Sequence, residues 1–261
     1  MGGKLGDFLH AMFAVKHICA QHNTKANIYM YDIGWEFGIH NTHRELQPIF
    51  LLQEYVNSFN ILEDYELDPI QTPQQSSPIK VYDSKLLEEG YTDLGAYIRS
   101  PWLYQACWSE LYSRTFNFKI GEDYKWITYN KVNLELRDKV LIQRKANVMR
   151  NKNFDYSSII QTYGKDNCVF ISSTILDYEE FPNKNDVPFY KISTLDEWFT
   201  AINSSAMVVA NLSAPVVMAH AMDKLRIVEL PHTVDAYHCI GEERYSKNVY
   251  WYSANNLNNL Q

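Results

Sequence analysis

The sequence has 261 residues, of which 46% are hydrophobic and 21% charged, and its formal net charge at pH 7 is −7. This length suits one large domain or two of ordinary size, and the acidic balance disfavours nucleic acid or an anionic membrane as a partner. The four cysteines are scattered without a CxxC pair, and no apolar run approaches the ~18 residues of a membrane span. We therefore expect a cytoplasmic protein with reduced thiols, no zinc site and no membrane span.

The first predicted element is a helix over residues 7–22, which follows a turn rich in glycine that includes Gly3 and Gly6. Glycine permits positive φ and a close approach to the backbone, and a helix that starts here directs N–H groups at an anion. Asp7 and His10 stand three residues apart and are expected on one helix face as candidate catalytic residues. The alternative is that Asp7 only caps the helix and that the glycines only make the turn.

The remainder of the first half alternates apolar-patterned segments with polar ones. In chain order we predict a strand over 26–31, a helix over 44–57, a short strand over 59–62, an exposed loop over 68–79 and a helix over 101–116. Residues 117–137 are polar and irregular, and we place the boundary between two domains, 1–130 and 131–261, inside this segment.

The second half has a regular rhythm of short apolar runs and helical patterns. We predict strands over 139–143, 168–171, 189–192, 207–210 and 225–230, and helices over 195–204 and 215–222. Ser193 or Thr194 can cap the first helix, and Pro215 suits the first position of the second. Alternation at this spacing indicates an α/β fold with a parallel sheet covered on both faces.

Two turns at the carboxyl ends of these strands are candidate binding sites, because open α/β sheets bind ligands there. The first carries three cations, Arg144, Lys145 and Arg150, which suit a phosphate clamp but are equally typical of solvated surface. The second is the turn 211–214, whose Ser213 and Ala214 open a helix that could hold a diphosphate or could simply be capped.

Two segments, 3–11 and 207–222, resemble the N-terminal loop and a late strand–turn–helix of the lipopolysaccharide heptosyltransferases. The resemblance implies the GT-B fold, with two Rossmann-like domains facing a cleft. It implies a trimmed N-terminal domain, since no strand residues precede Gly2, and residues 35–125 do not match the family.

The resemblance also implies roles for individual residues. Asp7 would be the general base, oriented by His10, and Asn211 stands where the family usually has aspartate. The implied donor contacts are Arg144, Arg150, Ser213 and Ala214 for the diphosphate and, for the nucleoside, one of the acids Asp177, Glu179 and Glu180. No Asp-x-Asp motif is present, so we expect no metal and no cofactor besides the co-substrate.

These features predict an inverting, metal-independent glycosyltransferase that moves a sugar from a nucleotide-diphosphate sugar to a hydroxyl of a glycan. One alternative is a non-catalytic nucleotide- or sugar-binding protein of the same fold. Another is a fucosyltransferase-like enzyme, whose loop has Gly-Asn where this chain has Gly6-Asp7. A nucleic-acid acceptor is disfavoured by the acidic charge. The loop 232–244, with Tyr237, His238, Glu242 and Glu243, could set donor specificity or be solvated surface.

Overall fold

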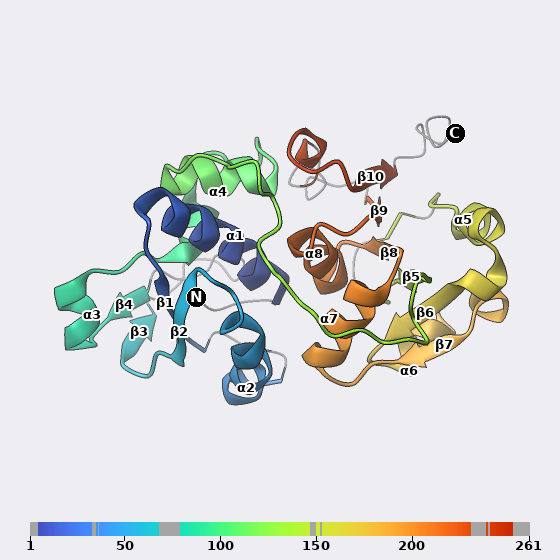
Figure 1. Cartoon of the computed structure of the whole chain (residues 1–261), viewed down its shortest axis with the longest axis horizontal. Coiled ribbons are helices and arrows are strands. Elements are labelled where there is room, and N and C mark those ends of the chain that lie inside the picture. The colour runs from blue at the N-terminus through green and yellow to red at the C-terminus, as the bar shows by residue number, and fades with distance from the viewer. Residues whose placement is uncertain are drawn as a thin grey trace. The chain divides into compact units, whose positions relative to one another are not determined.

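The computed structural model describes residues 5–32, 35, 37–67, 79–146, 150–151, 153–230, 239 and 241–252 (Figure 1). The chain divides into two compact units, Met1–Glu122 and Asp123–Gln261. The sequence predicts this boundary near residue 130, and the division falls earlier in the same irregular segment.

Unit 1 is built around the long helix α1. Its elements are α1 (Leu5–His22), β1 (Ala26–Met30), α2 (Ile39–Phe50), β2 (Val56–Ile61), β3 (Tyr65–Leu67), β4 (Ile79–Val81), α3 (Ser84–Glu89), η1 (Leu94–Arg99) and α4 (Trp108–Phe116). Among the described residues, β1 pairs with β2 in parallel and β3 with β4 antiparallel. Phe8 of α1 packs edge to face against Phe50 and Phe59, at ring-centroid distances of 5.4 and 5.9 Å, and so joins α1 to α2 and β2.

Two helix predictions in unit 1 are wrong in their bounds. The helix predicted over 44–57 is α2, which begins earlier because Gly38, at φ 74°, allows the chain to turn into a helix there. It ends at Phe50, where the Gln53 side chain donates a hydrogen bond to the carbonyl of Ile49 in the last turn, at 2.7 Å. Residues 56 and 57, which the prediction included in the helix, belong to β2. The short strand predicted over 59–62 lies largely within β2.

The helix predicted over 101–116 is confirmed only from Trp108 onwards. Residues 101–105 form turns, and Cys107 is the N-cap of α4. The aromatic residues near Pro101 therefore suit a helical pattern without forming one. The loop predicted over 68–79 lies outside the described residues except for Ile79, which begins β4.

Unit 2 confirms the predicted alternation of strands and helices. Its elements are β5 (Val140–Gln143), α5 (Tyr156–Tyr163), η2 (Lys165–Asn167), β6 (Cys168–Ser172), α6 (Ile175–Glu179), η3 (Lys184–Asp186), β7 (Phe189–Lys191), α7 (Leu195–Ser204), β8 (Met207–Asn211), α8 (Ala214–Ala221), β9 (Arg226–Glu229), η5 (Glu242–Arg244) and β10 (Val249–Tyr252). Of these, α5, α6 and β10 were not predicted.

The described strands of unit 2 form one parallel sheet in the order β10-β9-β8-β5-β6-β7. If the six strands β5 to β10 are numbered 1 to 6 in chain order, the sheet read from the β7 edge has the order 3-2-1-4-5-6. This is the arrangement of doubly wound α/β sheets. The expected parallel α/β sheet is therefore confirmed.

One face of this sheet packs against α5. Because side chains alternate along a strand, Ile142 points to the same face as Phe170 and Val209, its partners on β6 and β8. Ile159 and Ile160 of α5 complete this buried cluster. Full burial of a side chain such as Phe170 contributes about 3 kcal/mol, so the cluster holds the strand ends in place. Within the described part of the chain, none of the helices is long and apolar enough to cross a membrane.

Candidate functional site

The carboxyl ends of β5 and β8 form the centre of the candidate site. These strands are neighbours, and from them the chain runs in opposite directions, to β6 and β7 on one side and to β9 and β10 on the other. Ligands of open α/β sheets bind where the strand order reverses in this way. Gln143 pairs with Ala210, so the turns that start at Arg144 and Asn211 begin side by side. The fold therefore brings together the two turns that the sequence singles out.

The turn after β5 is held by two buried polar side chains, Asn211 of β8 and Asp177 of α6. Asn211 accepts a hydrogen bond from the backbone N–H of Lys145 at 3.0 Å and donates one to its carbonyl at 3.1 Å. Asp177 accepts from the N–H of Ala146 at 2.8 Å and from the hydroxyl of Ser172 at 2.6 Å. The path of the backbone here is thus set by contacts with β8 and with α6.

Arg144 makes a bidentate ion pair with Glu229 at the end of β9. Its Nε and Nη2 donate to the two carboxylate oxygens at 3.0 and 3.1 Å, and the two side chains are 11% and 0% exposed. The same carboxylate accepts from the N–H of Asn151 and from the hydroxyl of Tyr156, both at 2.6 Å. Burial raises the pKa of Tyr156 well above its usual value, and the charge of Glu229 raises it further, so the phenol remains a donor.

Arg150 and the neighbouring acids are paired within the protein. Arg150 donates to the carbonyl of Ala146 and to Glu180, the latter at 2.7 Å. Glu179 pairs with Lys184 at 2.5 Å. The three acids considered for the nucleoside therefore have different partners within the protein, and the Asp177 carboxylate holds the turn after β5.

The turn after β8 leads into α8 without a side-chain cap. Ser213 occupies the N-cap position, but its hydroxyl lies 2.7 Å from Oε1 of Gln143 and 3.0 Å from the carbonyl of Asn211. Pro215 has no N–H and the N–H of Val216 donates to the carbonyl of Ser213 at 3.1 Å, so the N–H of Ala214 is the one at the start of α8 that receives no acceptor from the N-cap side chain. Such a helix start favours an anion through its dipole and its N–H groups.

Asp7 lies in the first turn of α1, in unit 1, and is partly exposed. The hydroxyl of Tyr112 lies 3.4 Å from its backbone carbonyl. Burial raises the pKa of Tyr97 and of Tyr112, and the nearby charge of Asp7 raises both further. The carboxylate thus stands beside two phenols that remain protonated.

His10 is only 6% exposed and stacks on Trp108 of α4, with ring centroids 4.6 Å apart and planes 14° from parallel. His10 thus packs within unit 1, and the catalytic role that the resemblance implies for it stays a prediction. Gly6 lies in the first turn of α1, and Gly3 is outside the described residues.

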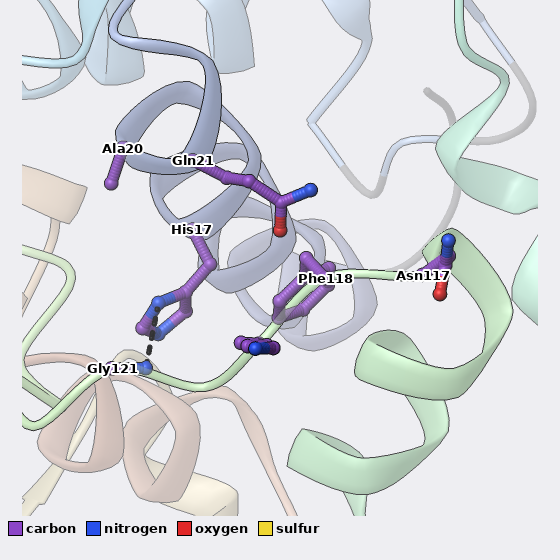
Figure 2. A pocket seen from close by; sticks show the side chains of 7 residues that line it. His17, Ala20, Gln21, Asn117, Phe118 and Gly121 are labelled. Carbon is purple, nitrogen blue, oxygen red and sulfur yellow. Dashed lines mark hydrogen bonds between the residues drawn. The ribbon is translucent and has the colours of Figure 1, made fainter.

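Two hollows in the described part of the chain lie away from these turns. Figure 2 shows one in unit 1, about 630 Å³ in volume, lined by residues that include His17, Gln21 and Phe118. His17 is ten residues beyond Asp7 along α1, which corresponds to ~15 Å of helix. A second, in unit 2, of about 480 Å³, is lined by Tyr190 and Asp196 among others. Neither contains a residue of the predicted site.

The loop 232–244 is described only in part. Tyr237 and His238 fall outside the described residues, whereas Glu242 is 1% exposed and accepts a hydrogen bond from Tyr124. Glu242 lies 3.6 Å from His220, in the last turn of α8, at the opposite end of that helix from Ser213. Among the residues that the structure describes, no three His, Cys, Asp or Glu side chains gather as a metal site would require.

The architecture is similar to that of known glycosyltransferases. The E. coli heptosyltransferase WaaC, solved with ADP, superposes with a TM-score of 0.57 at 10% identity, over 96% of this chain and 90% of WaaC. The chain has the fold of these heptosyltransferases. WaaC with ADP-2-deoxy-2-fluoro heptose gives a TM-score of 0.54 at the same identity and coverage.

A family 9 glycosyl transferase of Veillonella parvula also shares this heptosyltransferase fold. Its TM-score is 0.52 at 10% identity, over 97% of this chain and 84% of the other. No protein-family model and no curated protein sequence matches the chain. The expected resemblance to the heptosyltransferases is thus confirmed in the fold.

Glu229 is the residue of this site that the sequence does not single out. It stands in an otherwise apolar run, Ile227-Val228-Glu229-Leu230, which the pattern assigns to a buried strand. A carboxylate is almost never fully buried unless it is paired. A lone acid at the end of a buried strand was therefore a signal that a cation lies opposite it, although the sequence does not say which one.

Proposed function

We propose that this protein is an inverting glycosyltransferase that moves a sugar from a nucleotide-diphosphate donor to a hydroxyl of a glycan acceptor, without a bound metal. The observation that carries the proposal is that the turns beginning at Arg144 and Asn211 start side by side, at the reversal point of a sheet with the heptosyltransferase fold. The GT-B arrangement is part of the proposal, with the donor on a Rossmann-like unit 2 and the acceptor base on a Rossmann-like unit 1.

The chemistry needs a base for the acceptor and a stabiliser for the leaving group. Asp7 accepts the proton of the acceptor hydroxyl, which attacks the anomeric carbon from the face opposite the diphosphate, so the configuration inverts. Arg144 and the start of α8, through its dipole and the N–H of Ala214, stabilise the charge that develops on the departing diphosphate. Arg150 supports the same turn through Ala146. These fixed charges and dipoles take the place of a divalent cation.

The donor can be identified by thermal denaturation in the presence of ADP, GDP, UDP and CMP. A ligand that binds only the folded state raises the melting temperature, and a concentration of 100 Kd contributes about 2.7 kcal/mol. We expect one nucleoside diphosphate to raise it by several degrees, and CMP, with one phosphate, to have little effect. The absence of a shift with every diphosphate would refute the proposed function.

Asp7→Asn then tests the mechanism with the identified donor. We expect turnover to fall by about 10²–10⁴-fold, the usual contribution of a general base, while affinity for the nucleotide stays the same. Glu54→Gln makes the same chemical change at an exposed position of unit 1 and serves as the control. Unaltered turnover in Asp7→Asn would remove Asp7 from the mechanism, and nucleotide binding without any turnover in the unmodified protein would indicate a binding protein.

A further inference from the structure

The carboxylate of Glu229 accepts more hydrogen bonds than its ion pair with Arg144 alone provides. Glu229 is fully buried, and burial of a carboxylate is costly unless every lone pair finds a donor. Each of its oxygens receives two hydrogen bonds, Oε1 from Arg144 and the Asn151 N–H, and Oε2 from Arg144 and Tyr156. The carboxylate is therefore held in one orientation.

This arrangement also fixes the guanidinium of Arg144. Its Nε and Nη2 edge faces Glu229, and its centre lies 5.5 Å from the ring of Tyr156. Within the described residues, Nη1 makes no hydrogen bond. Nε and Nη2 of Arg144 are thus engaged by the protein, and the residue itself directly follows β5, whose end lies beside that of β8.

Glu229 acts on the turn after β5 at two positions. It receives Arg144 at the start of the segment 144–151 and the backbone N–H of Asn151 at its end. One side chain on β9 therefore sets both ends of the segment that follows β5, across the intervening strand β8.

We infer that Glu229 is a positioning residue that presents Arg144 to the diphosphate of the donor, an inference that rests on the proposed function. Glu229 touches no substrate and acts through Arg144. The negative charge of Glu229 offsets the positive charge of Arg144, so the net charge of the pair attracts anions only weakly. Its effect is geometric: Glu229 fixes the orientation of the guanidinium, and a diphosphate, which has more oxygens than a single phosphate, can contact both Arg144 and the start of α8, which follow the neighbouring strands β5 and β8.

The test measures the binding of inorganic pyrophosphate and of inorganic phosphate by calorimetry. Neither anion carries a nucleobase, and EDTA in the buffer removes metal ions, so the comparison reports only contacts with phosphate groups. Glu229→Gln places an amide NH₂ against donors and releases Arg144. Loss of a negative charge alone tightens the binding of both anions, so a loss confined to pyrophosphate can come only from a misplaced guanidinium. We expect the preference for pyrophosphate over phosphate to fall by about tenfold.

Three further variants separate positioning from stability. Tyr156→Phe removes one hydrogen bond to Glu229 but leaves Arg144 in place, and we expect the preference to change by less than about twofold. Arg144→Gln loses the preference, and adding Glu229→Gln to it has no further effect if Glu229 acts through Arg144. Should Glu229→Gln fail to fold, Glu229→Asp keeps the charge, draws the guanidinium back by one methylene, and is expected to lose the preference as well.

Equal changes for both anions in Glu229→Gln, or tighter binding of pyrophosphate, would overturn the inference and leave the proposed function standing. If the unmodified protein binds neither pyrophosphate nor any nucleoside diphosphate, the proposed function fails first.

Discussion

The phenolic oxygen of Tyr124 lies 2.5 Å from Nε2 of His220, and its hydroxyl donates to the carboxylate of Glu242. Whether Nε2 of His220 donates to the phenol or accepts from it depends on the tautomer of the imidazole. All three side chains are buried. The N–H of Trp126 also donates to the carbonyl of Ala221 at 3.0 Å, so the first residues of unit 2 are anchored at the end of α8.

Removal of that hydroxyl should destabilise unit 2. Tyr124→Phe leaves a buried carboxylate and a buried imidazole each without one hydrogen-bond partner, and we expect a loss of about 1–3 kcal/mol in the free energy of unfolding. Urea denaturation followed by fluorescence measures it. Tyr163→Phe, at a site 41% exposed, is the control and should stay within about 0.5 kcal/mol. Equal stability of the two variants would show that the network contributes nothing.

The amide of Asn211 fits the turn after β5 better than the aspartate that the resemblance implies at this position would. Asn211 both accepts from and donates to the backbone of Lys145, and a carboxylate can only accept. Asn211→Asp should therefore cost about 1–3 kcal/mol in unfolding free energy, and it should weaken nucleotide binding by adding negative charge beside the diphosphate. Asn203→Asp, at a partly exposed site, is the matched control. Tighter nucleotide binding in Asn211→Asp would contradict this explanation.

Asp155 should make the stability of unit 2 depend on pH. Hydrogen bonds from the hydroxyl and the N–H of Ser158, at 2.5 and 3.1 Å, hold the pKa of Asp155 below its usual value. Since the pKa is lower in the folded chain, the carboxylate stabilises the fold above the unfolded value of about 4, and this is lost as the pH falls through the folded value.

We therefore expect Asp155→Ala to cost about 1 kcal/mol at pH 7, the usual effect of losing an N-cap, and less below pH 4. Urea denaturation across this pH range measures the difference. Asp64→Ala, at an exposed position of unit 1, should show no such trend. A constant difference for Asp155→Ala down to pH 2 would contradict the expected linkage.

His10 should behave as a packing residue. His10→Phe keeps a flat ring against Trp108, so we expect turnover to change by less than about threefold, whereas His10→Ala should lose about 2 kcal/mol of stability through the cavity it leaves. Turnover with the identified donor and thermal denaturation measure the two effects. A hundredfold loss of turnover in His10→Phe with an unchanged melting temperature would restore the catalytic role.

The sequence by itself determined the elements whose signals are local. The helix predicted over 195–204 coincides with α7, because Thr194 and Glu197 form a capping box at its start. Apolar runs located five of the strands of unit 2, because a parallel strand that is buried on both faces is a nearly continuous hydrophobic run in the sequence. Where local pattern and tertiary contact disagree, as at the start of α2, the sequence placed the bounds wrongly.

Only the tertiary structure decided what the chemistry-bearing residues contact. Arg144 and Glu229 stand 85 positions apart, and Asp177 is 31 positions from the backbone amide it binds. Such pairs depend on the order of strands in the sheet, which sets which carboxyl ends are neighbours and which no local pattern encodes. The sequence could therefore locate a cation beside a strand end, but only the fold shows that a buried carboxylate orients it.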